Sequence, residues 1–185
     1  VHAWFPGEFM GDAVAQVLFG DYNPGGKLAV TFPRSVGQIP FAFPFKPGSD
    51  SKGFVRVTGT LYPFGYGLSY TSFDYSDLHL SALMPRSFEI SFKVRNTGKY
   101  DGEEVAQLYL RDEYASVVQP LKQLKHFARF YLKRGEEREV KFILSEEDFS
   151  LVDRNLKKIV EPGTFQIMIG AASNDIRLQT KVEIK

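Results

Sequence analysis

The feature that most constrains the fold is a series of short alternating apolar runs between residues 73 and 185. In one of them, four apolar side chains occupy every second position: Phe88, Ile90, Phe92 and Val94. This period of two predicts a strand with one buried face. About seven such runs, separated by turn residues, are typical of an immunoglobulin-like or fibronectin type III-like β-sandwich. Without cysteine, the chain lacks the Cys…Trp…Cys pattern of antibody domains.

Other runs predict where the strands lie in the sandwich. Residues 105–110 are apolar almost without interruption, which predicts a central strand. Residues 127–132 and 140–144 alternate again. Ser145 and Asp148 have the spacing of a helix cap and predict one short helical turn. Turns are predicted at 161–163 and 174–175, each followed by another strand.

The first residues predict a helix flanked by strand ends. Apolar residues have the spacing of one helical face at Met10, Ala13, Val14, Val17 and Leu18. Gly20 suits the left-handed position that ends such a helix. A strand is expected over residues 28–32, stopped by Pro33. Because these pieces cannot bury a core alone, we expect the rest of their domain upstream of Val1.

Residues 37–70 form a connector rich in proline, glycine and phenylalanine. Phe41, Phe43 and Phe45 predict an extended segment that packs on a neighbouring domain. Residues 46–53 have the composition of an exposed loop. Gly65 and Gly67 do not belong to a dinucleotide-binding motif, which needs a third glycine between a strand and a helix. We expect them instead to let the backbone pass closely over a surface.

Composition excludes several functions. The chain has 23 basic and 22 acidic residues, evenly spread, with a net charge of +1, so nucleic acid is not an expected partner. No apolar run approaches the roughly 20 residues that span a bilayer, so no membrane association is expected. His2, His79 and His126 lie far apart in sequence and predict no metal site. No cofactor is expected.

Candidate catalytic and binding residues are few. Glu8 follows a strand end and begins the helix, but the favoured interpretation is that it complements the helix N-terminus. Trp4 is expected at a domain interface rather than on a sugar. Tyr100, Tyr114 and Phe149 are candidates for stacking on sugar rings, although core or edge positions are the favoured interpretation.

Several motifs resemble one family closely and in order. In the first part of the chain these are WFPG at residues 4–7, GDAVAQVLFGDYNPGGKL at 11–28, TFPRS at 31–35 and LYPFGYGLSYTSF at 61–73. The later ones are VRNTG at 94–98, GEEVAQLYL at 102–110, PLKQLKHF at 120–127 and EPGTF at 161–165. The chain resembles glycoside hydrolase family 3, the β-glucosidase and β-xylosidase group. It departs from the family pattern at residues 8–11, where a small acidic-glycine pair is usual.

The resemblance implies a mainly β fold in three parts. These are the C-terminal end of an α/β sandwich domain (residues 1–45), a linker (46–72) and a fibronectin type III-like β-sandwich (73–185). The family hydrolyses terminal β-linked sugars with retention, using a nucleophilic Asp and an acid/base Glu. Both belong to domains expected upstream of Val1, so no residue here is assigned a catalytic role. The implied function is therefore the structural or accessory C-terminal portion of a retaining β-glycosidase, inactive alone.

Alternatives stay open. The chain could be a non-catalytic module that binds carbohydrate or protein, or a brace for the catalytic domains. The resemblance also implies a periplasmic or extracellular location, a β-linked glycoside as substrate of the absent domains, and a homodimer as one form of assembly. It does not indicate which sugar is cut, or whether the loop from Lys46 to Gly59 reaches a cleft.

Overall fold

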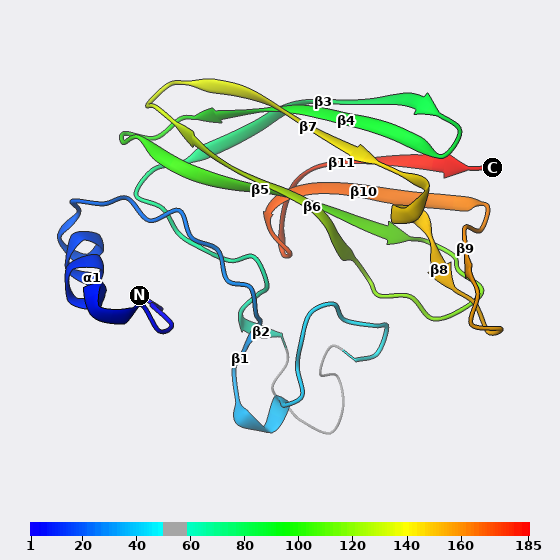
Figure 1. Cartoon of the computed structure of the whole chain (residues 1–185), viewed down its shortest axis with the longest axis horizontal. Helices are drawn as coiled ribbons and strands as arrows, with labels where there is room; N and C mark the ends of the chain where they lie inside the picture. The colour runs from blue at the N-terminus through cyan, green and yellow to red at the C-terminus, as the bar shows by residue number, and fades with distance from the viewer. Residues whose placement is uncertain (50–58) are drawn as a thin grey trace.

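The computed structural model describes residues 1–49 and 59–185, and its largest part is a two-layer β-sandwich (Figure 1). One layer has three strands, in the order β3 (Phe73–Met84), β4 (Ser87–Asn96) and β7 (Glu137–Leu144). The other has four strands, in the order β11 (Asp175–Ile184), β10 (Gly163–Ala172), β5 (Gly102–Asp112) and β6 (Gln123–Leu132). All neighbouring strands pair antiparallel. The predicted sandwich and the central position of β5 are confirmed.

The core lies between the two layers and consists of the inward-facing residues of the alternating runs. On the three-stranded side these include Ile90, Phe92 and Val94 of β4 and Val140, Phe142 and Leu144 of β7. The four-stranded side contributes Leu108 and Leu110 of β5 and Ile167 and Ile169 of β10, among others. Burying these aliphatic and aromatic side chains on both faces of the interface is what holds the layers together.

Short elements close one end of the sandwich. The helical turn η3 (Glu146–Phe149) follows β7, and β8 (Leu151–Val152) pairs with β9 (Lys158–Ile159). The backbone N–H of Ser145 donates to Oδ2 of Asp148 at 2.8 Å, which satisfies one of the donors at the start of the turn. The predicted helical turn is confirmed.

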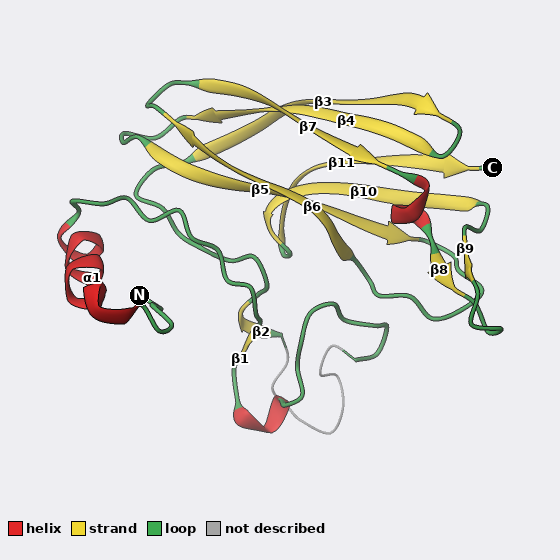
Figure 2. Cartoon of the chain, in the orientation of Figure 1, coloured by secondary structure: helices red, strands yellow, loops and turns green. Residues whose placement is uncertain are grey.

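The N-terminal part consists mainly of loops (Figure 2). Its elements are η1 (Gly7–Phe9), α1 (Met10–Phe19), β1 (Phe32–Pro33), η2 (Val36–Gln38) and β2 (Thr60–Tyr62). The predicted helix and its end are confirmed, because Gly20 has a φ of 88° and its N–H donates to the carbonyl of Gln16 at 3.1 Å. No residue of α1 is buried; Val14, Ala15 and Val17 are half-buried, and the rest of the helix is exposed.

The strand expected over residues 28–32 is wrong in its position. Only Phe32 and Pro33 form a strand, paired with β2. Leu28 instead exchanges two backbone hydrogen bonds with residues 65–66: its N–H donates to Tyr66 and its carbonyl accepts from Gly65, both at 2.8 Å. A longer ladder does not form there because the partner segment begins at Pro63, which has no N–H, and turns at Gly65, where φ is 80°.

The connector packs against this chain's own sandwich. Phe43 stacks on Phe64 with ring centroids 4.5 Å apart and meets the ring of Tyr109 edge-on at 5.8 Å. Tyr109 lies on the outer face of β5, so the connector buries this face of the four-stranded sheet. This explains why β5 is apolar without alternation. Residues 46–49 are exposed, as predicted, while residues 50–53 of the same predicted loop lie outside the described residues.

Gly65 and Gly67 confirm the prediction of close backbone approach. A Cβ on Gly65 would lie 2.1 Å from Oε1 of Gln107 on β5, and one on Gly67 would lie 2.1 Å from the carbonyl oxygen of Gly26. At Gly67 the obstacle is backbone, which cannot rotate away. The two glycines therefore let residues 63–68 pass between the segment around Gly26 and the sheet.

Gly67→Ala is expected to lower the free energy of unfolding by about 1–3 kcal/mol, because the added methyl overpacks the contact with Gly26. Urea denaturation followed by fluorescence measures this difference. Gly11→Ala is the matched control, since a Cβ there meets no atom within 4 Å and lies in α1. Equal denaturation midpoints for the two variants would contradict the close approach.

Candidate functional site

A seam between residues 20–28 and the sandwich contains a buried ion pair. Nζ of Lys27 lies 3.2 Å from Oε1 of Glu104 on β5, and both side chains are largely shielded from water. Lys27 also donates to the carbonyl of Gly67 at 3.2 Å, and the N–H of Val105 donates to the Glu104 carboxylate at 2.9 Å. Burial, followed by the charge of Glu104, raises the pKa of the neighbouring Tyr75 well above its ordinary value. The pair joins three segments that are distant in sequence.

Two asparagines extend the seam with hydrogen bonds. Asn96 is fully buried at the end of β4; it accepts from Oγ1 of Thr71 at 2.7 Å and donates to the carbonyls of Tyr100 and Leu132. Asn23 accepts from the N–H of Tyr70 at 2.7 Å and donates to the carbonyl of Asp101 at 2.8 Å. These side chains satisfy backbone groups that would otherwise be unpaired where the loops cross.

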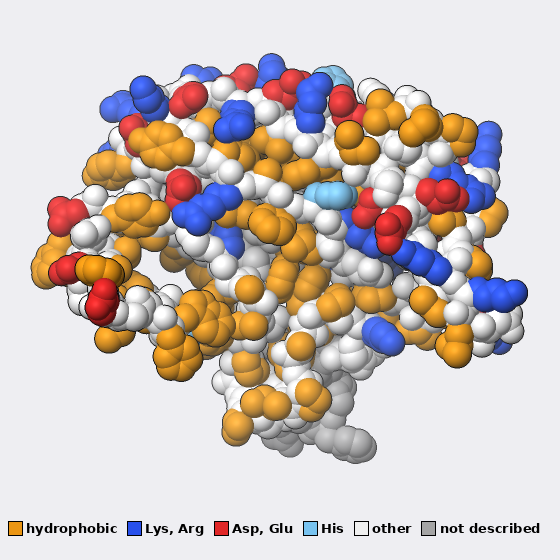
Figure 3. All heavy atoms as spheres, in the orientation of Figure 1, with side chains coloured by type: hydrophobic (Ala, Val, Ile, Leu, Met, Phe, Trp, Pro, Cys, Tyr) orange, Lys and Arg blue, Asp and Glu red, His pale blue; other side chains and the backbone are white. Residues whose placement is uncertain are grey.

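A groove of about 890 Å³ opens beside the seam. Its walls are the end of α1 with the following turn on one side, and the turn from β4 to β5 with part of β6 on the other. Figure 3 shows the molecule hollowed where the α1 segment faces the sandwich. Four tyrosines and three carboxylates line it: Tyr22, Tyr70, Tyr100 and Tyr131 with Asp21, Asp101 and Glu103.

Hydrogen bonds hold three of the tyrosines. Tyr22 donates to Oε2 of Glu103 at 3.1 Å, and Tyr131 donates to Oδ2 of Asp101 at 2.8 Å. Tyr70 donates to the carbonyl of Val17 at the end of α1. The rings are thereby fixed in direction, while each remains substantially exposed.

The surroundings of two groove carboxylates, Glu103 and Asp101, favour their ionised form. The guanidinium of Arg129 hydrogen-bonds to Glu103 and holds the pKa of that carboxyl below its ordinary value. The N–H of Arg134 and the hydroxyl of Tyr131 lower the pKa of Asp101. The pKa of Tyr22 is raised by burial and by its hydrogen bond to Glu103. At neutral pH Glu103 and Asp101 are therefore hydrogen-bond acceptors, and the hydroxyl of Tyr22 stays protonated.

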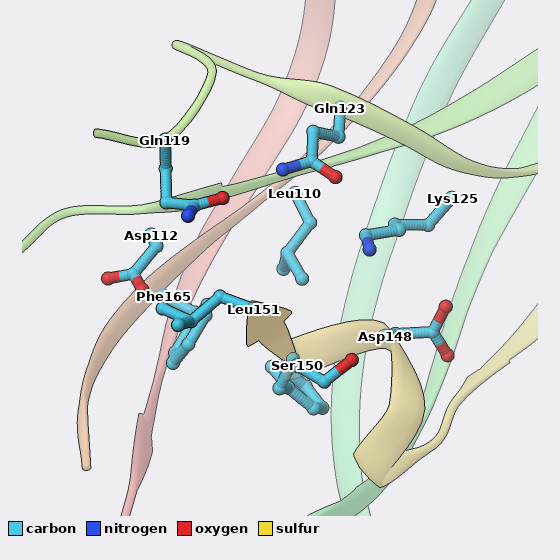
Figure 4. A pocket seen from close by; sticks show the side chains of 10 residues that line it. Leu110, Asp112, Gln119, Gln123, Lys125, Asp148, Ser150, Leu151 and Phe165 are labelled. Carbon is cyan, nitrogen blue, oxygen red and sulfur yellow. The ribbon is translucent and has the colours of Figure 1, made fainter. Parts of the chain in front are cut away.

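Another, much smaller pocket cannot hold a substrate. It lies between β6 and η3 and has a volume of about 20 Å³, close to the space that one water molecule needs. In Figure 4 the ends of Gln123 and Lys125 point toward Leu110, while the carboxylate of Asp148 points away. Burial lowers the pKa of Lys125. We regard this cavity as part of the packing beneath η3.

The structure places the three histidines apart. His2 lies beside Trp4 near the N-terminus, and His79 is exposed on β3. Nε2 of His126 is 3.6 Å from Oδ2 of Asp148, and its ring stacks on Phe142. Among residues 1–49 and 59–185, no three His, Asp or Glu side chains converge as a metal site would require. No helix in this described part is long and apolar enough to span a bilayer.

Glu8 and Trp4 do not form a site together. Glu8 lies in the turn η1, exposed and without a side-chain partner among the described residues. Trp4 is 57% exposed and meets the ring of His2 edge-on, with centroids 4.3 Å apart. Through His2 and Phe32 it begins a row of aromatic contacts that reaches Tyr62 and Tyr66.

The three aromatic candidates for sugar stacking differ in exposure and in position. Phe149 has the core position that was the favoured interpretation: it is 2% exposed and meets Phe88 and Phe165, because η3 folds back onto the sandwich. Tyr114 is 84% exposed and lies in the loop between β5 and β6. Tyr100 is 60% exposed and lies in the groove. The other groove tyrosines were missed because their proximity depends on the crossing loops.

Comparison with known proteins shows the family to which the chain belongs. Residues 1–70 match the family model of the glycosyl hydrolase family 3 C-terminal domain, and residues 104–173 match that of the fibronectin type III-like domain. The fold, a sandwich preceded by a helix-bearing segment docked along a seam, is thus that of the C-terminal region of these hydrolases. The chain belongs to glycoside hydrolase family 3.

The relatives are longer than this chain. It is 46% identical over 187 residues to a β-xylosidase of Formosa agariphila, covering 97% of this chain and 26% of the relative. It is 44% identical over 191 residues to a periplasmic β-glucosidase of Salmonella typhimurium, covering 96% of this chain and 25% of the relative. The chain thus spans about a quarter of the length of the curated relatives it matches.

Solved structures agree with this assignment. A β-glucosidase from Erythrobacter marinus superposes with a TM-score of 0.91 at 41% identity, over 99% of this chain and 25% of that one. A β-glucosidase from Listeria innocua in complex with glucose gives a TM-score of 0.86 at 35% identity, over 99% and 27% of the two chains. The arrangement of the N-terminal segment on the sandwich is therefore shared with intact enzymes.

Proposed function

We propose that this chain is the C-terminal, accessory portion of a longer retaining β-glycosidase that acts on terminal β-linked sugars. The observation that carries the proposal is the order of the two family matches, at residues 1–70 and 104–173, within a quarter of the relatives' length. The names of those relatives support a β-glucoside or β-xyloside as substrate. Residues 1–45, 46–72 and 73–185 are the proposed end of the α/β domain, linker and sandwich.

The proposed role of the sandwich is to brace the segment before it. The buried Lys27–Glu104 pair, the Asn96 and Asn23 hydrogen bonds and the connector rings all join residues 1–72 to the strands. These contacts are structural, and none presents a nucleophile to solvent. The catalytic Asp and Glu, about 5–5.5 Å apart in a retaining enzyme, are proposed to lie in the other domains of the protein.

The purified 185-residue chain is expected not to hydrolyse aryl β-glucosides or aryl β-xylosides above the buffer rate, because the catalytic carboxylate pair is proposed to lie in the other domains of the protein. Release of nitrophenol measures this directly. A full-length relative such as the Salmonella typhimurium β-glucosidase serves as the positive control. Hydrolysis by the chain that persists after a second purification would refute the accessory role.

Two further properties are proposals that follow from the family. A periplasmic or extracellular location is supported by the name of one relative, and cell fractionation of the native host tests it. Association of the intact protein into a homodimer is tested by light scattering coupled to size-exclusion chromatography.

A further inference from the structure

The outer strand of the three-stranded layer is long and has a free side. β3 (Phe73–Met84) has 12 residues and is the longest strand that the structure describes (Figure 1). On one side it pairs with β4, and on the other it pairs with no strand of the described part of the chain. A free strand edge presents unpaired backbone N–H and C=O groups, to which an extended strand of another molecule can bind.

The second half of β3 has the composition that favours such pairing. Residues 78–84, LHLSALM, include four large apolar side chains and contain no proline, glycine, Asp, Glu, Lys or Arg. Leu83 and Met84 are exposed. Segments of about six or seven residues with this composition pair with copies of themselves when they lie on a free edge. We call residues 78–84 the uncharged segment.

A β-bulge interrupts β3 just where the uncharged segment begins. Ser76 pairs with position 93 of β4 and His79 with position 91, so two residues of β3 lie opposite one residue of β4. Asp77, the first of these two, has a left-handed φ of 54°, and its Oδ2 lies 3.0 Å from Nζ of Lys93. Only residues 73–76 and 79–82 keep a regular register. Each stretch is shorter than a typical strand of about five or six residues.

The packing of the core does not require the extra residue. Tyr75, Leu78 and Leu80 are half-buried and pack against the core. Because Tyr75 and Leu78 are three positions apart, removing one residue between them restores the spacing of two that a regular strand has. Each inward-facing side chain would then stay on its own face of the sheet. Burial therefore does not explain the left-handed backbone at Asp77, and strain of this kind persists where it serves another purpose.

We propose that the bulge at Asp77 prevents β3 from pairing edge to edge with β3 of a second copy of this chain. An antiparallel pair of β3 strands would be symmetric, so both copies would present the same uncharged segment. The bulge bends the edge and shortens each regular stretch. The carboxylate of Asp77 adds a charge next to the uncharged segment, and Pro85 and Arg86 follow its other end.

Deletion of Asp77 tests the proposal, because it leaves a regular edge strand. At chain concentrations on the order of 100 μM, size-exclusion chromatography with light scattering should give about twice the mass of the parent chain or more. Circular dichroism shows whether the variant is folded. Deletion of Ser76 also removes the extra residue but keeps the carboxylate, so it should associate too, to a smaller extent. If only one of the two variants folds, that variant decides the test.

Two controls separate edge pairing from other causes of association. Asp77→Asn removes the charge but keeps a residue that tolerates a left-handed backbone, so it should have the mass of the parent. If it associated as the deletion does, the charge and not the bulge would be responsible, and the inference would be overturned. Ser81→Lys, added to the Asp77 deletion, places a lysine at an exposed position of β3 and should restore the parent's mass, because edge lysines oppose pairing.

Three other results would overturn the inference: a folded deletion variant with the mass of the parent, association that Ser81→Lys does not reverse, or failure of both deletion variants to fold. The last result would show that the core needs the extra residue. None of them affects the proposed function, which rests on family matches and is tested by hydrolysis.

Discussion

Glu104→Ala is expected to lower the free energy of unfolding by about 3–5 kcal/mol, because it leaves the ammonium of Lys27 buried without its counter-ion. The cost arises mainly from the unpaired charge, which has been removed from water. Urea denaturation of the purified chain measures it. Added salt should change the difference little, since a buried pair is poorly screened.

The matched control replaces both charges. Lys27→Met combined with Glu104→Leu fills the same space with apolar atoms and should be close to neutral or stabilising, because no charge is left buried. A double-mutant cycle with the two single variants then gives the coupling energy. If Glu104→Ala were as stable as the parent, the pair would not be buried as the structure places it, and the seam would be a weak contact.

Phe92→Ala is expected to destabilise the sandwich by about 3–5 kcal/mol, because it opens a cavity between the two layers. Phe92 is 1% exposed; its ring centroid lies 6.0 Å from that of Tyr75 and 5.8 Å from that of Phe142. Since a domain is typically stable by only about 5–15 kcal/mol, this one change removes a large share. Thermal unfolding followed by circular dichroism measures it.

Phe127→Ala is the control for Phe92, because Phe127 is also a strand phenylalanine but is 65% exposed on β6. Its effect should stay within about 0.5 kcal/mol. Phe92→Leu retains most of the volume and should fall between the two, which keeps the comparison usable if the alanine variant does not fold. Similar losses for Phe92→Ala and Phe127→Ala would contradict the assigned register of the strands.

The seam couples the stability of the sandwich to that of the segment before it. If the seam contributes several kcal/mol, the sandwich and the segment before it unfold together rather than as separate units. Damage to the sandwich would then reach the N-terminal segment through Lys27 and Asn23. Stability would fall before the chemistry of hydrolysis changed.

Much of the sandwich was predictable because alternation of side chains and burial on one face are the same property. Residues 140–144 were predicted as an alternating run, and its apolar members Val140, Phe142 and Leu144 are buried in β7. The helix ending at Gly20 and the turn capped by Ser145 were predictable because both depend on contacts within a few residues. The family was identifiable from ordered motifs that cover the chain.

The features that the sequence did not predict have one cause in common: each depends on a contact with a segment that is distant in sequence. The expected strand over residues 28–32 shortens because its partner β2 ends at Tyr62, just before Pro63, and the burial of Phe149 depends on η3 folding back onto Phe88. Neither relation can be read from local pattern. The same is true of the groove: of its tyrosines, only Tyr100 was a candidate.

The sequence alone determined the class of fold and the family, because strand period, glycine and proline positions and ordered motifs are local along the chain. Only the tertiary structure decided that Lys27 reaches Glu104, that the connector covers β5 and that four tyrosines line one groove. The physical reason is that these features join segments far apart in sequence. How the loops cross the sheet decides which of these segments come together, and the local conformational preferences of the residues do not determine that crossing.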